Sequence, residues 1–125
     1  MKVISTEKAP AAIGPYSQGI VAGDFFFASG QIAIIPETGE IAEATIEAQT
    51  EQGMKNIGNL LAAAGVDYSK VVKTSCFLAD MGDFGAFNEI YAKYFISKPA
   101  RSCVAVKTLP KNVLCEVEVI AYLGE

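Results

Sequence analysis

The only arginine of the chain, Arg101, lies in the run "KPARSCVAV", residues 98–106, which is typical of a partly buried β-strand. A permanent charge is costly to bury, so Arg101 either reaches solvent at the mouth of the strand or meets an anion. Pro99 fixes the entry to the strand, and Cys103 and Ala105 share the face of Arg101. A planar guanidinium in such small, apolar surroundings suits a two-point grip on a small carboxylate.

A carboxyl group is the second candidate for chemistry. Glu116 lies in one row of the last predicted strand with Leu114 and Ile120, where burial would raise the pKa of its carboxyl toward neutrality. A carboxyl group tuned in this way can exchange protons with water. Glu118 lies two residues further along and has an equal claim from the pattern. The residues alone therefore leave the choice between the two glutamates open.

Four other side chains could line a ligand site. Tyr16, in "IGPYSQG", sits where a tyrosine is more often a packing residue, although its hydroxyl could orient a ligand. Ser29 ends a predicted strand before Gly30, where hydroxyl and backbone can both approach a ligand. Asn88 needs hydrogen-bond partners if it is buried in the second predicted helix. We interpret Cys103 as a pocket wall, since the chain has no histidine to activate it as a nucleophile.

Composition excludes several classes of function. Without histidine there is no Ser-His-Asp or Cys-His relay and no His-ligated zinc, and the chain contains neither a P-loop nor a GxGxxG motif. The net charge of −4 disfavours nucleic acid as a partner. The three cysteines form no CxxC pair, and neither a membrane-length apolar run nor a signal peptide is seen. We predict a cytoplasmic protein with reduced thiols that binds neither metal nor membrane.

The hydrophobic pattern predicts one α+β domain over residues 1–125. Between residues 45 and 64 the apolar positions recur at helical spacing, and Gly65 suits the end of that helix. A second helix is expected with Asp83 as its N-cap. The expected elements are strands at 17–21 and 25–34, a helix at 45–64, a strand at 70–79, a helix at 83–95, and strands at 100–106 and 113–123. This order predicts a sheet with both helices packed on one face.

The last predicted strand indicates what covers the other face of the sheet. One of its rows is wholly apolar and is expected to face the helices: Cys115, Val117, Val119, Ala121 and Leu123. The opposite row is mixed instead of polar: Leu114, Glu116, Glu118, Ile120 and Tyr122. Because a solvent-facing row normally carries more polar residues, we expect a second copy of the chain to cover it.

Five stretches of the sequence, spread over essentially the full length of the chain, together resemble the RidA (YjgF) family. They are "APAAIGPYSQG", "SGQI", "FNEIYAKYF", "PARSCVAV" and "LPKNVLCEVEVIA". The resemblance implies a fold like that of the small chorismate mutases, assembled as a homotrimer with ligand sites in the clefts between subunits. One departure is that the loop "FISKP" is slightly shorter than usual for the family, which bears on the rim of the cleft.

The resemblance also implies an activity that needs no cofactor. It is the hydrolysis of reactive 2-imino acids such as 2-iminopropanoate and 2-iminobutanoate, tautomers of enamines, to 2-oxo acids and ammonia. It implies Arg101 as the clamp for the substrate carboxylate and Glu116, now preferred over Glu118, as the residue that activates water. Tyr16, Ser29, Asn88 and Cys103 fall on pocket positions. The alternatives are a module that senses small carboxylates without turnover and, less favoured by the acidic composition, an RNA-cleaving inhibitor of translation.

Overall fold

The sheet is built around the last strand, β6 (Cys115–Tyr122), in which buried and more exposed residues alternate. In the computed structural model, which describes residues 1–124, the strands lie in the order β1-β2-β3-β6-β4-β5. The bounds of the other strands are β1 (Lys2–Ile4), β2 (Gly19–Ala22), β3 (Phe25–Ala28), β4 (Val71–Leu78) and β5 (Ala100–Ala105). The predicted single α+β sheet is thus confirmed.

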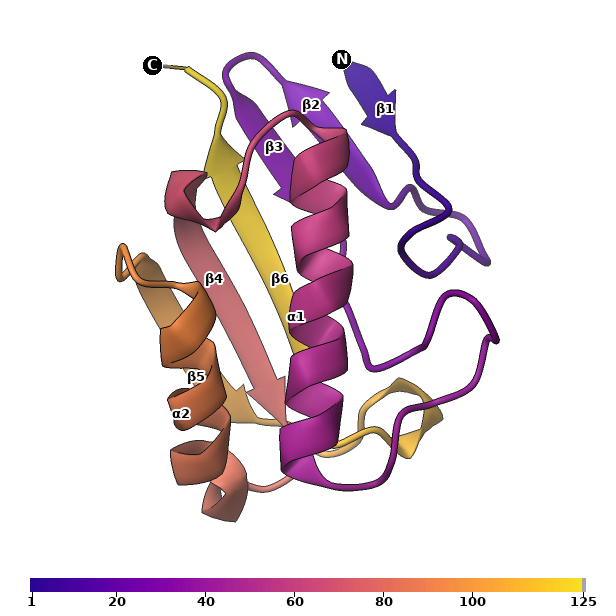
Figure 1. Cartoon of the computed structure of the whole chain (residues 1–125), viewed down its shortest axis with the longest axis vertical. Coiled ribbons are helices and arrows are strands. Elements are labelled where there is room, and N and C mark those ends of the chain that lie inside the picture. The colour runs from indigo at the N-terminus through magenta and orange to yellow at the C-terminus, as the bar shows by residue number, and fades with distance from the viewer. Residues whose placement is uncertain (125) are drawn as a thin grey trace.

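Two helices, α1 (Ile46–Ala63) and α2 (Phe84–Tyr94), lie side by side across one face of this sheet (Figure 1). Thr45 caps α1, because its hydroxyl accepts a hydrogen bond of 3.1 Å from the backbone N–H of Ala48. Gly65 follows the helix with φ +85°, the left-handed conformation predicted for it. No helix among residues 1–124 is long and apolar enough to span a membrane.

Three details differ from the sequence prediction. The short edge strand β1 was not expected. The strand expected at 25–34 ends at Ala28. Ser29 still bonds Gln18 in the register of β2 and β3, but beyond it the chain meets β6 only through a bridge between Gln31 and Val117. The expected cap at Asp83 is wrong. Its backbone is already helical, and Asp80 instead caps a short 3-10 helix that leads into α2.

The unit β4–α2–β5 fixes where Arg101 lies. Strands β4 and β5 are parallel, so the chain must cross over the sheet between them, and α2 makes that crossover. In the strand order, β5 lies at one edge of the sheet. It pairs with β4, and β4 pairs on its other side with β6. Arg101, the second residue of β5, therefore stands at an edge with α2 above it.

The two faces of the sheet differ as the last strand predicts. The apolar row of β6 from Cys115 to Ala121 is buried beneath the helices. The other face, called here the open face, carries no helix formed by residues 1–124 and exposes large apolar side chains such as Val3, Phe25, Phe27 and Val104. A free apolar face of this kind is typical of a surface that another chain covers. The homo-oligomer stays a prediction.

Candidate functional site

Arg101 is held by α2 in two ways. Its Nη1 donates a hydrogen bond of 2.6 Å to Oδ1 of Asn88. Its Cζ lies 4.7 Å from the ring centroid of Tyr91 and 5.4 Å from that of Phe84, within the range of cation–π attraction. The surroundings of the guanidinium are therefore aromatic, instead of only the small residues that the sequence suggested.

The spacing along α2 explains this arrangement. Phe84, Asn88 and Tyr91 are separated by four and three residues, so they share one face of the helix. The hydroxyl of Tyr91 shares a buried hydrogen bond of 2.7 Å with Oγ1 of Thr74, which pairs with Arg101 across β4 and β5. The docking of α2 on β4 thus fixes the wall against which Arg101 packs.

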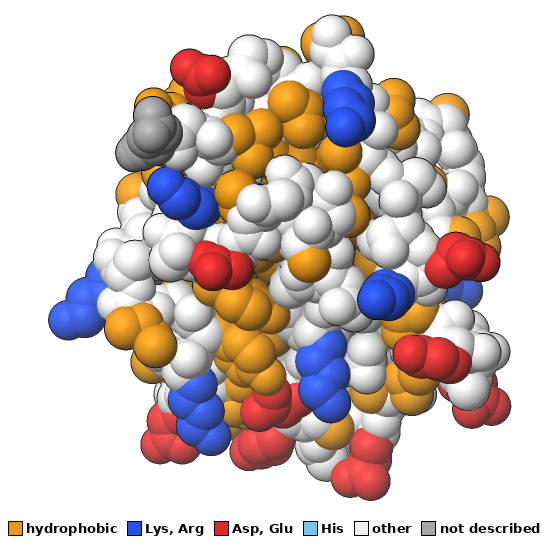
Figure 2. Space-filling view, turned by 45° about the horizontal axis from the view of Figure 1, so that its top comes forward, with side chains coloured by type: hydrophobic (Ala, Val, Ile, Leu, Met, Phe, Trp, Pro, Cys, Tyr) orange, Lys and Arg blue, Asp and Glu red, His pale blue; other side chains and the backbone are white. Residues whose placement is uncertain are grey.

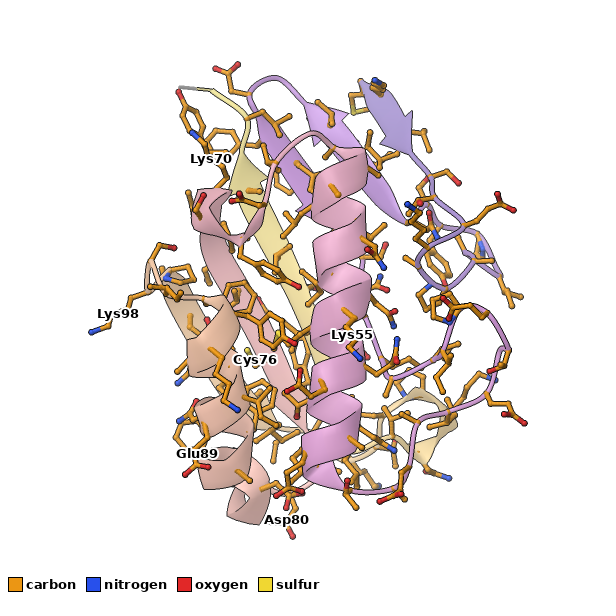
Figure 3. The ribbon with its side chains drawn as sticks, in the orientation of Figure 1. Lys55, Lys70, Cys76, Asp80, Glu89 and Lys98 are labelled. Carbon is orange, nitrogen blue, oxygen red and sulfur yellow. The ribbon has the colours of Figure 1, made fainter. Side chains whose placement is uncertain are left out.

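Cys103 lies on the same face as Arg101, two residues along β5, and is half-buried. Burial raises the pKa of its thiol, and the charge of Arg101 offsets part of that rise. The neighbouring thiol of Cys76 on β4, which is seen between the two helices in Figure 3, has its pKa raised to about 12, again by burial. Both cysteines therefore carry protonated thiols near neutral pH, which argues against Cys103 as a nucleophile. Cys103 is a neighbour of Arg101 on β5 but does not line the cavity beside it, so its expected role as a pocket wall stays a prediction.

A cavity of about 490 Å³ opens beside Arg101 and Asn88. It is lined further by Tyr91, Phe95 and the loop through Pro99. Lys98 belongs to the same loop, but its side chain extends away from the molecule (Figure 3). Arg101 with Asn88, Phe84, Tyr91 and Cys103 is called the Arg101 half-site below.

Glu116 lines a second cavity of about 540 Å³. Burial is the main cause that raises the pKa of its carboxyl, and the charge of Glu118 adds to the rise. Glu118 itself is exposed. The structure therefore distinguishes the two glutamates in the direction that the family resemblance implies. Glu116 with the other cavity residues Tyr16, Ser29, Gly30 and Gln31 is called the Glu116 half-site.

The two other predicted residues of this cavity have different roles in the chain. Tyr16 is 54% exposed, so it is not a packing residue in this chain, and it lines the cavity. Ser29 donates its hydroxyl to the backbone carbonyl of Ser17 at 2.6 Å. That bond commits the Ser29 proton to holding the loop, while its oxygen and backbone still border the cavity.

Sequence reasoning missed Gly30, Gln31 and Lys111 as cavity residues. Gln31 is buried, and its Nε2 donates to the carbonyl of Ser29 at 3.1 Å. Lys111 has φ +56°, which is uncommon for a residue with a side chain and occurs more often at functional sites. The stretches "SGQI" and "LPKN" carried the family resemblance, and they could have directed attention to these three positions.

The two half-sites do not meet within one chain. Arg101, Thr74 and Val119 are paired across adjacent strands, and paired residues project from the same face of a sheet, here the face under the helices. Val104, Phe77 and Glu116 are likewise paired across the same three strands. Each lies an odd number of residues from its counterpart in the first set, so these side chains project from the open face. The structure therefore groups Arg101, Asn88 and Cys103 on one face and Tyr16, Ser29 and Glu116 in a separate cavity.

Comparison with known proteins gives the family relationships of this chain. The model of the family described as Endoribonuclease L-PSP matches residues 6–123. An Arabidopsis thaliana chloroplastic protein named Reactive Intermediate Deaminase A is 55% identical over 98% of this chain and 66% of that protein. A mouse protein named 2-iminobutanoate/2-iminopropanoate deaminase is 48% identical over 98% of this chain and 92% of that protein.

A solved structure agrees with these matches. The crystal structure of a Thermotoga maritima protein, described as a candidate endoribonuclease, superposes with a TM-score of 0.97 at 47% sequence identity, covering 100% of this chain and 99% of that one. The fold and the cavities beside Arg101 and Glu116 define a small α+β protein with a ligand-sized hollow on either side of one sheet. The chain belongs to the Endoribonuclease L-PSP family, which is the RidA (YjgF) family that its sequence resembles.

Proposed function

We propose that this protein hydrolyses reactive 2-imino acids, such as 2-iminopropanoate and 2-iminobutanoate, to 2-oxo acids and ammonia. The observation that carries the proposal is the complementarity of the two half-sites. One presents an oriented guanidinium and the other a half-buried carboxyl with a raised pKa. These are the two groups that hydrolysis of a small imino acid needs, one for the carboxylate and one for the proton.

Arg101 is the proposed clamp for the substrate carboxylate. Its bond to Asn88 occupies one of the five N–H donors of a guanidinium, so others remain for two carboxylate oxygens. Bidentate pairing of this kind fixes both position and orientation. The aromatic rings of Tyr91 and Phe84 keep the guanidinium in place before the substrate arrives.

Glu116 is the proposed proton carrier. As a carboxylate it takes a proton from water while the water oxygen bonds to C2 of the protonated imine, and the C=N π electrons move onto nitrogen. Glu116 then gives that proton to the nitrogen, and the C–N bond breaks to release ammonia. The hydroxyl passes its proton to the Glu116 carboxylate as the C=O bond forms, and transfer of that proton to the released ammonia gives ammonium and restores the carboxylate. A pKa raised by burial suits a group that must both accept and return a proton near neutral pH.

The complete site requires two copies of the chain, because the half-sites lie on opposite faces of the sheet within one copy. The edge position of β5 allows Arg101 of one copy to approach the Glu116 cavity of the next. The exposed apolar residues of the open face supply a surface for that contact. We propose a cyclic homo-oligomer, expected to be a trimer, with sites between neighbouring copies.

RNA cleavage is the weaker alternative, although the family description names an endoribonuclease. The net charge is −4, and the face shown in Figure 2 has basic and acidic side chains interspersed without a continuous basic patch. Binding to a nucleic-acid backbone normally depends on such a patch. Deaminase and ribonuclease assays on the same purified oligomer distinguish the two.

The test couples the protein to a dehydratase that releases 2-aminoacrylate or 2-aminocrotonate and follows formation of the 2-oxo acid. Arg101→Ala is expected to lower kcat/KM about a hundredfold, the equivalent of losing a charged contact of about 3 kcal/mol. Lys55→Ala, an exposed cation on α1 that lines neither the Arg101 cavity nor the Glu116 cavity, is the matched control and should leave the rate unchanged. No acceleration by the wild-type protein would refute the proposal.

Glu116→Gln separates catalysis from mere binding. A deaminase should lose about a hundredfold or more in kcat, the usual contribution of a positioned acid–base group. It should still bind the product 2-oxo acid through Arg101, measurable by calorimetry. A sensing module without turnover would show binding in both proteins and deamination in neither.

A further inference from the structure

The backbone at Gly30 passes directly against the carboxyl group of Glu116. A Cβ built on Gly30 would lie 2.0 Å from Oε2 of Glu116, 2.8 Å from its Cδ and 3.1 Å from its Cγ. The first two distances are shorter than any real contact of a Cβ atom. Any side chain at position 30 would thus occupy the space in which the Glu116 carboxyl lies.

The segment around Gly30 cannot easily withdraw to make room. On one side Gln31 exchanges two backbone hydrogen bonds with Val117, of 2.8 and 3.1 Å. On the other side Ser29 is bound through its N–H to Gln18 at 2.9 Å and through its hydroxyl to Ser17 at 2.6 Å. A side chain added at Gly30 would therefore displace the flexible end of Glu116, not the backbone.

Backbone conformation does not explain this glycine. Gly14, Gly23, Gly39 and Gly65 adopt positive φ values that favour glycine, whereas Gly30 is not among the positive-φ residues. Alanine at position 30 would therefore not meet the penalty of a left-handed backbone. The close approach to the Glu116 carboxyl is therefore the reason that position 30 needs a residue without a side chain.

We infer that Gly30 is a positioning residue. Its backbone, which carries no side chain, packs as a wall against the carboxyl group of Glu116 and holds that group at the mouth of the cavity. The inference rests on the proposed function, in which Glu116 carries the proton. To that function the inference adds that the close approach of the backbone at Gly30 sets the position of the Glu116 carboxyl. The same wall keeps water from one side of the carboxyl, in agreement with burial as the main cause of its raised pKa. The other titratable groups around it are Glu118 on β6, and Tyr16 and Lys111 in the cavity lining.

Gly30→Ala in the full-length oligomer tests the inference. The variant is expected to fold, since only a side-chain end must move, and to lose about tenfold or more in kcat. KM should change by less than about twofold, because the Arg101 clamp is untouched. The titration of the Glu116 carboxyl, followed by carbon-13 NMR, should move to lower pH as the displaced group becomes hydrated. Gly85→Ala is the matched control, because its Cβ would meet nothing within 4 Å, and it should leave kcat and the titration unchanged.

A double-mutant cycle gives the decisive result. If Gly30 acts through Glu116, adding Gly30→Ala to Glu116→Gln should reduce kcat no further. An equal further loss, or a Gly30→Ala protein with wild-type kcat and titration, would overturn the inference. Should Gly30→Ala fail to fold, adding Glu116→Ala must restore folding, because it removes the clashing atoms. A double variant that stays unfolded would also overturn it.

Failure of the inference can be distinguished from failure of the proposed function. A wild-type protein without deaminase activity would refute the function, yet the NMR titration of Glu116 would still test the placement. An active wild-type protein whose Glu116 titrates identically with glycine or alanine at position 30 would refute the placement alone.

Discussion

The two half-sites hold their charged groups in opposite ways. Arg101 is held by partners: a hydrogen bond to Asn88 and two aromatic rings from the same helix face. Glu116 is half-buried without such partners among residues 1–124, and the backbone of Gly30 lies against its carboxyl. The causes of its raised pKa are burial and the like charge of Glu118, both of which disfavour the ionised form.

The difference follows from what each group is proposed to do. An arginine cannot lose its proton, so partners cost it nothing and improve its orientation. A carboxylate that accepts several N–H bonds has a lowered pKa and becomes a poor proton carrier. An arginine that binds a substrate can therefore have many hydrogen-bond partners. A carboxyl group that transfers protons must instead be left without N–H donors around it.

The sharpest test of the comparison is to mix two inactive variants. Arg101→Ala retains Glu116, and Glu116→Gln retains Arg101, so a mixed oligomer regenerates intact sites between unlike copies. With random assembly from equal amounts, about a quarter of the interfaces combine both functional residues, and activity should rise from near zero to about a quarter of the wild-type level. Co-refolding followed by the deaminase assay measures this recovery.

The control for that experiment is the mixture of either variant with itself, which should stay inactive. If the mixed oligomer also stays inactive while both variants fold and assemble, the two residues do not form one site across a subunit boundary.

A smaller effect is expected when the orientation of Arg101 is loosened. Asn88→Ala removes the partner of the guanidinium, and losing one hydrogen bond of about 1–1.5 kcal/mol predicts a KM about tenfold higher with a smaller change in kcat. Asn59→Ala on α1, whose amide bonds the backbone of Lys8, is the matched control. An unchanged KM in Asn88→Ala would show that the aromatic rings alone hold Arg101.

The smallest predicted effect concerns stability. Because the folded-state pKa of Glu116 is raised, the native protein binds more protons than the unfolded chain, and stability falls as pH rises through the window between the two pKa values. Glu116→Gln removes this dependence. The variant should therefore melt slightly higher than wild type at neutral pH and equally at a pH below the unfolded pKa, as calorimetry can measure. A wild type that is the more stable of the two at neutral pH would contradict the burial of a charged carboxyl.

Much of the fold was predictable because its signals are local. The helix at 45–64 rested on apolar residues at helical spacing, and α1 begins and ends within two residues of that range. The alternating rows of β6 predicted which side faces the helices. The strand expected at 25–34 failed beyond Ala28, because the residues that follow pair only through isolated bridges, of Gln31 with Val117 and of Ile34 with Ile41. Long-range pairing decides such an end, and composition does not record it.

The candidate site divides in the same way. Residue types singled out Arg101, since a lone arginine is visible in the sequence, and narrowed the carboxyl to Glu116 or Glu118, between which only the family resemblance chose. The separation of Arg101 and Glu116 onto two faces of the sheet depends on the register of β4 with β5 and β6, which sequence spacing does not reveal. The close approach of Gly30 to Glu116 could not be predicted from residue type, because it depends on which side chain stands opposite the glycine.

The sequence by itself determined the inventory: one guanidinium, no imidazole, and two helices and a sheet able to bury an apolar row. Only the tertiary structure decided which glutamate is shielded from water and which helix face meets Arg101. The reason is physical. Burial and hydrogen bonding depend on distances between residues far apart in the chain, and these distances exist only once the strands have paired.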